Sequence, residues 1–343
     1  MRARQETSDM TTADLERFRA LLVEREELLN EYVSRLGAAP STEVDKVRGL
    51  LADIRAAFHR IEDHSFGTCE VCKGEVEYDR LEVQPIRQIC LDCISVEEKT
   101  LLEDELLIAS RIHRALLPQQ VERIEGFELA VKSLAARSIG GDYYDFLSGA
   151  SGGMKVVIAD SMGKGIPAGL LMSNLQGALR VLAPDMKSPG ALVGKLNWWL
   201  CRNVPVSKFI SLACIDITPT LTSVSVKYAN AGHPPIILVR ADGNCMNLLP
   251  TGGVLGVHED FEYSEQAIAI HAGDLLVMYT DGVTEAGNDS GEMFGDERLA
   301  QFCRDHRMEP PGAFIEQLLG SVRDFTGRES LEDDLTVIAI RKK

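Results

Sequence analysis

Aspartates that adjoin apolar, strand-like runs are the residues of this sequence with the most readable chemistry. Asp160 follows KVVIA, Asp281 follows LLVMYT, and the pair Asp333 and Asp334 directly precedes LTVIAI. Acids at the ends of buried strands converge on one rim of a sheet, and crowded carboxylates repel one another unless cations neutralise them. Hard oxygen ligands select Mg²⁺ or Mn²⁺. The sequence therefore predicts a divalent-metal site at this rim.

Asp142 has a related setting in the stretch GGDYYDF at residues 140–146. Taken one at a time, all these acids also fit ordinary turn residues, because aspartate favours turns beside glycine and caps helices. Their coincidence is what favours a metal site. His233 in NAGHPP is open to two interpretations, an acid for a leaving oxygen or a turn-stabilising residue, and we leave it out of the catalytic set.

Four of the eight cysteines form the pattern C-x2-C-x17-C-x2-C, at Cys69, Cys72, Cys90 and Cys93. Two close thiolate pairs on separate turns are what tetrahedral zinc requires. With all four ligand positions filled by the protein, the ion would be structural. A redox-active cysteine pair and an iron–sulfur cluster are the alternatives for this spacing.

Composition limits the classes of partner. The 343-residue chain has a formal net charge of −16, which repels nucleic-acid backbone and anionic lipid. No apolar run approaches the roughly 20 residues that span a bilayer, and the first residues contain no export signal. These features predict a cytoplasmic protein that binds neither membranes nor nucleic acid.

The chain divides into four parts by pattern. Residues 9–63 have apolar positions at helical spacing, interrupted by GAAPST, and predict a helical hairpin. Residues 64–98 contain the cysteines, and residues 99–119 predict a helical linker ended by proline. Residues 120–343 mix strand-like and helical runs, as a two-sheet core flanked by helices would need. The fold class is α+β, and the linker is either a plain connector or a helix that transmits a signal.

The run FGTCEVCKGEVEYDRLEVQPIRQICLDC after a helical hairpin resembles the DksA/TraR-type zinc-finger family, over roughly residues 10–98. Members that enter RNA polymerase share an acidic motif at the hairpin tip, whereas the tip here, GAAPST, has no aspartate. The departure argues against polymerase binding. It leaves the module as a sensor, a dimerisation unit or a docking arm.

A second resemblance rests on six motifs in order, namely GGDYYD, VVIADSMGKGIPAGLLM, YANAGHPP, LLVMYTDGVTEA, FGDERL and DDLTVIAI. Together they resemble the SpoIIE/RsbU-type branch of the PPM (protein phosphatase 2C-like) serine/threonine phosphatases, across roughly residues 124–343. The resemblance implies a β-sandwich flanked by helices that holds two Mn²⁺ or Mg²⁺ ions, with a water between the ions attacking phosphorus.

Carried over by motif, the resemblance also implies roles for residues. Asp160 would bridge both ions, Asp281 and Asp333 would each hold one, and the backbone carbonyl of Ser161 would complete the coordination sphere. Asp142 would act through a ligating water or through another ligand.

Two positions near these ligands are assigned by their chemistry. In DDLT either acid fits a ligand; we favour Asp333 and expect Asp334 to hold the loop through backbone hydrogen bonds, while keeping it in the metal set. Arg137 suits bidentate phosphate binding, although arginines are also common on solvated loops.

These patterns predict a metal-dependent phosphoserine/phosphothreonine protein phosphatase with one structural Zn²⁺. By resemblance its substrate is a phosphorylated STAS-type anti-sigma-factor antagonist or another phosphoprotein, and the zinc-finger module regulates it, with a possible homodimer through the linker helix. A cysteine-dependent phosphatase is excluded because no cysteine begins a C-x5-R loop. The alternatives are a transcription-machinery binding protein that uses the hairpin, or a finger that only stabilises folding.

Overall fold

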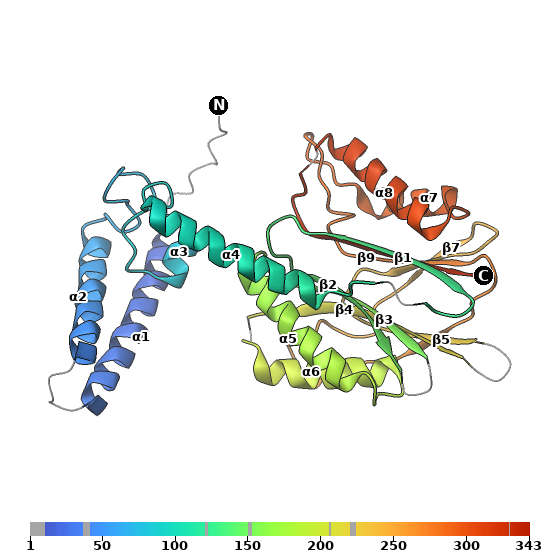
Figure 1. The fold of residues 1–343 in the computed structure, drawn as a ribbon, viewed down its shortest axis with the longest axis horizontal. Coiled ribbons are helices and arrows are strands. Elements are labelled where there is room, and N and C mark those ends of the chain that lie inside the picture. The colour runs from blue at the N-terminus through green and yellow to red at the C-terminus, as the bar shows by residue number, and fades with distance from the viewer. Residues whose placement is uncertain are drawn as a thin grey trace. The chain divides into compact units, whose positions relative to one another are not determined.

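The computed structural model describes residues 11–36, 42–120, 123–149, 153–205, 207–219, 224–328 and 330–343. Its contacts divide the chain into two compact units, residues 1–105 and 106–343. The boundary falls inside helix α4 (Val96–Leu116), the helix predicted from the linker sequence (Figure 1). No helix among the described residues combines the length and apolarity needed to cross a membrane.

The first unit contains the helical hairpin and the cysteine-rich segment. Helices α1 (Thr12–Leu36) and α2 (Thr42–Glu62) lie side by side, and the short helix α3 (Tyr78–Val83) follows the first cysteine pair (Figure 1). The predicted break GAAPST lies outside the described residues apart from its last residue, where α2 begins.

One apolar core unites this unit. Phe18 and Leu22 of α1 and Ile54 of α2 pack with residues of the cysteine-rich segment, such as the fully buried Leu81. The segment therefore folds against the hairpin and shares its core.

The second unit is built on two antiparallel five-stranded sheets. One sheet has the order β1-β10-β9-β6-β7 and the other the order β2-β3-β4-β5-β8. The bounds are β1 (Phe127–Leu134), β2 (Asp142–Ser148), β3 (Met154–Ser161), β4 (Ile210–Pro219), β5 (Val224–Ala231), β6 (Ile236–Val239), β7 (Cys245–Leu248), β8 (Gln266–Ile268), β9 (Leu275–Tyr279) and β10 (Leu335–Lys342).

Strand alternation explains why two sheets form and where each side chain goes. In β3, Val156 and Ile158 belong to the core between the sheets, whereas Val157 and Ala159 belong to the core under the helices α5 (Ile166–Leu182) and α6 (Pro189–Asn203). A run buried on both faces must be apolar throughout, as this one is.

The other sheet follows the same rule. In β10, Ile338 faces the partner sheet and Val337 faces the helices α7 (Gly295–Asp305) and α8 (Pro311–Thr326). Four layers result, with a helix pair on each outer face of the two sheets (Figure 1). The predicted α+β fold with a two-sheet core flanked by helices is confirmed.

Candidate active site

The pairing of β2 with β3 brings together two of the predicted acids. Asp142, at the start of β2, is directly opposite Asp160, near the end of β3. Asp142 lies on the same face of β2 as Phe146, and Asp160 lies on the same face of β3 as Ile158. The side chains of Phe146 and Ile158 belong to the core between the sheets. Because side chains alternate along a strand, the two carboxylates lie at one end of the gap between the sheets.

Asp142 is held by hydroxyl groups from the opposite sheet. Thr280 donates its Oγ1–H to Asp142 Oδ2 at 2.8 Å, and the Oγ1 of Thr336 lies 2.6 Å from the same oxygen. Asp142 is buried, and its burial, together with the charge of Asp160, raises its pKa well above the usual range. The two threonines thus tie one sheet to the other through a single carboxylate.

Sequence reasoning missed both threonines, although each adjoins a predicted acid. Thr280 directly precedes Asp281, and Thr336 is two residues after Asp334. The adjacency was a usable signal, because a hydroxyl on the inward-facing side of a strand needs a hydrogen-bond partner.

Asp142, Asp160, Asp281 and Asp333 form one electrostatically coupled group, called here the carboxylate rim. Burial, followed by the charges of Asp281 and Asp333, raises the pKa of Asp160 to about 7. Burial also raises the pKa of Asp281, with the charge of Glu285 next in importance. Glu285, which sequence reasoning did not select, is placed by a turn in which its N–H bonds the Asp281 carbonyl at 2.7 Å.

A lysine ammonium lies on this rim. Lys164 Nζ is 2.8 Å from Asp333 Oδ2 and donates to the Glu332 carbonyl at 2.9 Å. The surplus of carboxylates, the raised pKa of Asp160 and this cation on Asp333 all fit a site that accepts positive charge. The donor set of oxygens suits Mg²⁺ or Mn²⁺.

Asp334 differs from its neighbour Asp333. Its Oδ1 accepts the N–H of Ala136 at 2.8 Å, and its Oδ2 accepts the N–H of Gly141 at 2.6 Å. Asp334 is buried with both oxygens occupied by backbone donors, as expected for a residue that holds the loop. Asp333 is about two-fifths exposed and faces the rim, which keeps it the better ligand candidate.

Glycines allow the backbone to come this close. A Cβ on Gly282 would lie 2.0 Å from the Asp334 carbonyl oxygen, and one on Gly141 would lie 2.9 Å from the Ser161 carbonyl oxygen. The Ser161 hydroxyl donates towards the carbonyls of Gly141 and Ala168, each at 3.0 Å. The glycines therefore let the backbone pack closely against Asp334 and Ser161, two residues of the predicted metal set.

The second acid of GGDYYDF has a structural role. Asp145 is buried on the outer face of β2, where Arg180 of α5 binds it with two hydrogen bonds of 2.9 Å. Tyr143 donates to the same carboxylate. This network fixes α5, the helix that begins five residues after Ser161.

Arg137 and His233 are placed differently from the rim acids. Arg137 is exposed and lines a cavity of about 310 Å³ on the side of Asp142 and Asp334. His233 is buried, its Nδ1 lies 2.8 Å from Ser211 Oγ, and its backbone is bonded by Asn230. These contacts favour the turn-stabilising interpretation of the histidine.

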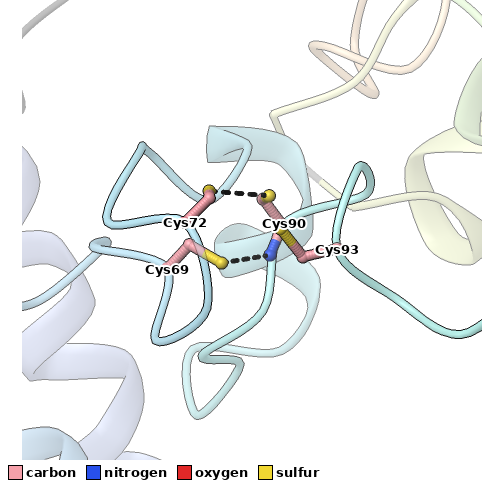
Figure 2. Close-up of side chains that lie close together, drawn as sticks. All are labelled: Cys69, Cys72, Cys90 and Cys93. Atoms are coloured by element: carbon pink, nitrogen blue, oxygen red, sulfur yellow. Dashed lines mark hydrogen bonds between the residues drawn. The ribbon is translucent and has the colours of Figure 1, made fainter.

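The four cysteines form a compact cluster in the first unit (Figure 2). Their sulfur atoms all lie within 4.8 Å of one another, and Cys72 Sγ is 3.6 Å from Cys90 Sγ. Backbone N–H groups of Cys72 and Cys90 lower the pKa of Cys69 to about 6, which favours its thiolate. Four sulfur ligands at this spacing match a closed zinc site.

Comparisons with known proteins cover both units. Residues 150–343 match the family Stage II sporulation protein E (SpoIIE), and residues 64–99 match the prokaryotic dksA/traR C4-type zinc finger. Phosphoserine phosphatase RsbU of Bacillus subtilis is 29% identical over 246 residues, which are 71% of each chain. The RNA polymerase-binding transcription factor DksA of Escherichia coli is 37% identical over 54 residues, 16% of this chain and 36% of DksA.

Solved structures share the fold of the second unit. The SiaA-PP2C domain of Pseudomonas aeruginosa is 22% identical with a TM-score of 0.61, and the match covers 73% of this chain and all of that domain. The RsbU and RsbW domains of Rv1364c from Mycobacterium tuberculosis are 24% identical with a TM-score of 0.53, over 64% of this chain and 62% of that one.

Two antiparallel sheets between helix pairs define a PP2C-like fold. The chain belongs to the SpoIIE family and carries a DksA/TraR-type zinc finger ahead of that domain. The predicted family and the predicted enzyme class, a serine/threonine phosphatase, are confirmed.

Proposed function

We propose that this protein is a metal-dependent phosphoserine/phosphothreonine protein phosphatase of bacterial signalling, with its catalytic domain over residues 120–343. The observation that carries the proposal is the meeting of Asp142, Asp160, Asp281 and Asp333 at one end of the sandwich, with a pKa of about 7 for Asp160. Carboxylates so arranged are costly unless cations join them.

Each acid has a proposed role in this site. Asp160 would bridge two Mn²⁺ or Mg²⁺ ions, Asp281 and Asp333 would each bind one, and the carbonyl of Ser161 would add a ligand. Such a metal pair supplies an activated water and neutralises charge on the phosphoryl oxygens. Asp142, fixed by its two threonines, would orient that water or a neighbouring ligand.

Arg137 and Asp334 complete the proposed set. Arg137 forms no ion pair among the described residues, so its guanidinium is free to meet a substrate phosphate. Asp334 would support Asp333 by holding the loops of Ala136 and Gly141. The four cysteines would hold one structural Zn²⁺.

The relatives support a proposal for the substrate class. RsbU is a phosphoserine phosphatase, and we propose that the substrate here is a phosphorylated STAS-type anti-sigma-factor antagonist in the cytoplasm. The zinc-finger unit and α4 would regulate activity. Several apolar residues of α4 are exposed, with Ile108 at 56% and Ile112 at 60%, which favours a homodimer through this helix.

Hydrolysis of para-nitrophenyl phosphate by the full chain, with Mn²⁺, Mg²⁺ or EDTA, tests the chemistry. We expect metal-dependent turnover that falls at least 1,000-fold in Asp160→Asn and Asp281→Asn. Asp185→Asn is the matched control, because Asp185 is exposed beyond the far end of α5, a 17-residue helix about 25 Å long. Equal turnover in all four proteins would contradict the proposed site.

Regulation has a separate test. A chain that begins at Pro118 should differ from the full chain in turnover or in oligomeric state, measured by light scattering. Identical values in both would remove the proposed role of the zinc-finger unit and α4. Release of phosphate from phosphorylated STAS-domain proteins, compared with an unrelated phosphoprotein, tests the substrate class.

A second candidate function is supported by the DksA-like segment. The hairpin and finger share one core, so residues 11–36 and 42–99 would offer a compact surface to the transcription machinery. Recovery of RNA polymerase by the full chain, lost when the hairpin is deleted, would favour this function.

A further inference from the structure

Helix α4 ends in two buried polar side chains, Ser110 and His113. Its residues from 106 onward belong to the same compact unit as the carboxylate rim. The part of the helix before residue 106, by contrast, exposes leucines such as Leu101 and Leu102. A buried imidazole at the end of an otherwise exposed helix needs a hydrogen-bond partner that offsets its desolvation.

The partner of His113 is the backbone of the GGDYYDF stretch. Its Nε2 lies 2.9 Å from the carbonyl oxygen of Gly140. A carbonyl oxygen only accepts, so Nε2 carries the proton in this contact. Burial lowers the pKa of His113, which keeps the ring neutral and Nε2–H available as the donor at neutral pH.

One side of the imidazole lies beside Gly169 of α5. A Cβ on Gly169 would lie 3.4 Å from His113 Cδ2, which is an ordinary van der Waals distance. On another side, the cavity of about 310 Å³ is lined by His113, Arg137 and Asp142. Packing alone therefore does not enclose the ring, and the hydrogen bond to Gly140 fixes its position.

The two residues after Gly140 each touch the rim. Gly141 donates its N–H to Asp334 and accepts the hydroxyl of Ser161. Asp142 is paired with Asp160 and bonded by the two threonines. The Gly140 carbonyl is therefore one or two residues from backbone and side-chain contacts to Asp334, Ser161 and Asp160.

We propose that His113 is a positioning residue, whose hydrogen bond to Gly140 makes the geometry of the carboxylate rim depend on how the end of α4 is seated. This inference rests on the proposed function, because it assigns a structural basis to regulation of the same site. The linker helix acts on metal binding without touching a metal ligand.

Three substitutions in the full chain separate the hydrogen bond from mere packing. His113→Gln places an amide N–H near the position of Nε2, His113→Asn carries the same amide on a side chain one methylene shorter, and His113→Leu fills the space without a donor. Binding of Mn²⁺ alone is measured by calorimetry. Turnover of para-nitrophenyl phosphate is measured over a range of Mn²⁺ concentrations. Thermal unfolding verifies that each variant is folded.

We expect His113→Leu and His113→Asn to bind Mn²⁺ about tenfold more weakly, to lower kcat about tenfold and to leave KM for the small substrate within about twofold. His113→Gln should recover Mn²⁺ binding and kcat to within about threefold of the wild type.

Two results overturn the inference while the phosphatase function stands. One is wild-type Mn²⁺ affinity and kcat in a folded His113→Leu protein, and the other is a His113→Gln protein no better than His113→Leu. A wild-type chain that neither binds Mn²⁺ nor turns over substrate would overturn the proposed function, and the inference with it.

Discussion

The cysteine cluster and the carboxylate rim are two candidate metal sites built in opposite ways. The cysteines come from a segment of 25 residues, and their four sulfurs already lie within 4.8 Å of one another. The rim acids come from β2, β3, the turn after β9 and the turn before β10. Among the described residues, no set of carboxylates gathers its oxygens as tightly.

The difference separates a metal that folds a segment from metals that would act on a substrate. A closed four-sulfur site leaves no position for another ligand, and its ion contributes to folding. The rim is already held by the sandwich through hydrogen bonds such as those of Asp142 and Asp334. Its carboxylates repel one another, which favours the binding of cations, and Asp333 is about two-fifths exposed.

Zinc removal should give the largest effect and affect one unit only. Structural zinc contributes apparent binding free energies of about 10–16 kcal/mol in small fingers, so a chelator should unfold residues 64–99. Hydrogen exchange read by mass spectrometry should rise there. Both tryptophans, Trp198 and Trp199, lie in the second unit, so their fluorescence should stay unchanged. If the cysteine-rich segment kept its protection from hydrogen exchange without zinc, the metal would not be what folds it, and the contrast between the two sites would not hold.

Lowering the pH should reduce the unfolding free energy of the second unit through protonation of His233. Burial lowers the pKa of His233 to about 3, against about 6.5 in an unfolded chain. The unfolded state therefore binds the extra proton first, and stability present above pH 6.5 is lost as the pH falls towards 3. The loss has a slope of up to about 1.4 kcal/mol per pH unit.

Urea unfolding followed by tryptophan fluorescence at pH 7.5 and pH 5 measures this effect. His233→Gln should reduce the pH dependence of the unfolding free energy, and His258→Gln, which changes an exposed histidine of the same unit, should not. Equal pH dependence in all three proteins would exclude His233 as the titrating group.

Removal of a hydrogen-bond partner of Asp142 should have a smaller, local effect on the carboxylate rim. Thr336→Val keeps the side-chain shape but removes one of the two hydroxyl partners of a buried carboxylate. We expect a loss of about 1–3 kcal/mol in unfolding free energy and weaker Mn²⁺ binding. Thr100→Val, at an exposed position of α4 in the first unit, is the matched control and should leave Mn²⁺ binding and the stability of the second unit unchanged. Unchanged Mn²⁺ affinity in Thr336→Val would show that the rim does not need this long-range support.

Competition between Lys164 and a metal should give the smallest effect. The Lys164–Asp333 ion pair is about two-fifths exposed on both sides, and such pairs contribute about 0–1 kcal/mol. Lys164→Gln should therefore strengthen Mn²⁺ binding by up to about fivefold in calorimetry. Lys208 lies beside Gly163 but forms no ion pair among the described residues, so Lys208→Gln should have a smaller effect. Weaker Mn²⁺ binding in Lys164→Gln would make the lysine a support of the site.

Much of the fold could be predicted from the sequence because its signals are local. Alternation in KVVIA places Val156 and Ile158 on one face and Val157 on the other without reference to any distant residue. The acids at strand ends could likewise be predicted to share a rim. Their partners could not, because the bond from Gly141 to Asp334 joins residues 193 positions apart.

The sequence by itself indicated the chemistry of the two candidate metal sites, through cysteine spacing in one unit and the order of six motifs in the other. Only the tertiary structure decided which groups surround those ligands: the threonines on Asp142, the lysine on Asp333 and His113 on Gly140. The physical reason is that residue type and short spacing fix local conformation and ligand preference. The partners of a buried polar group depend on strand register and helix packing, which the whole chain sets together.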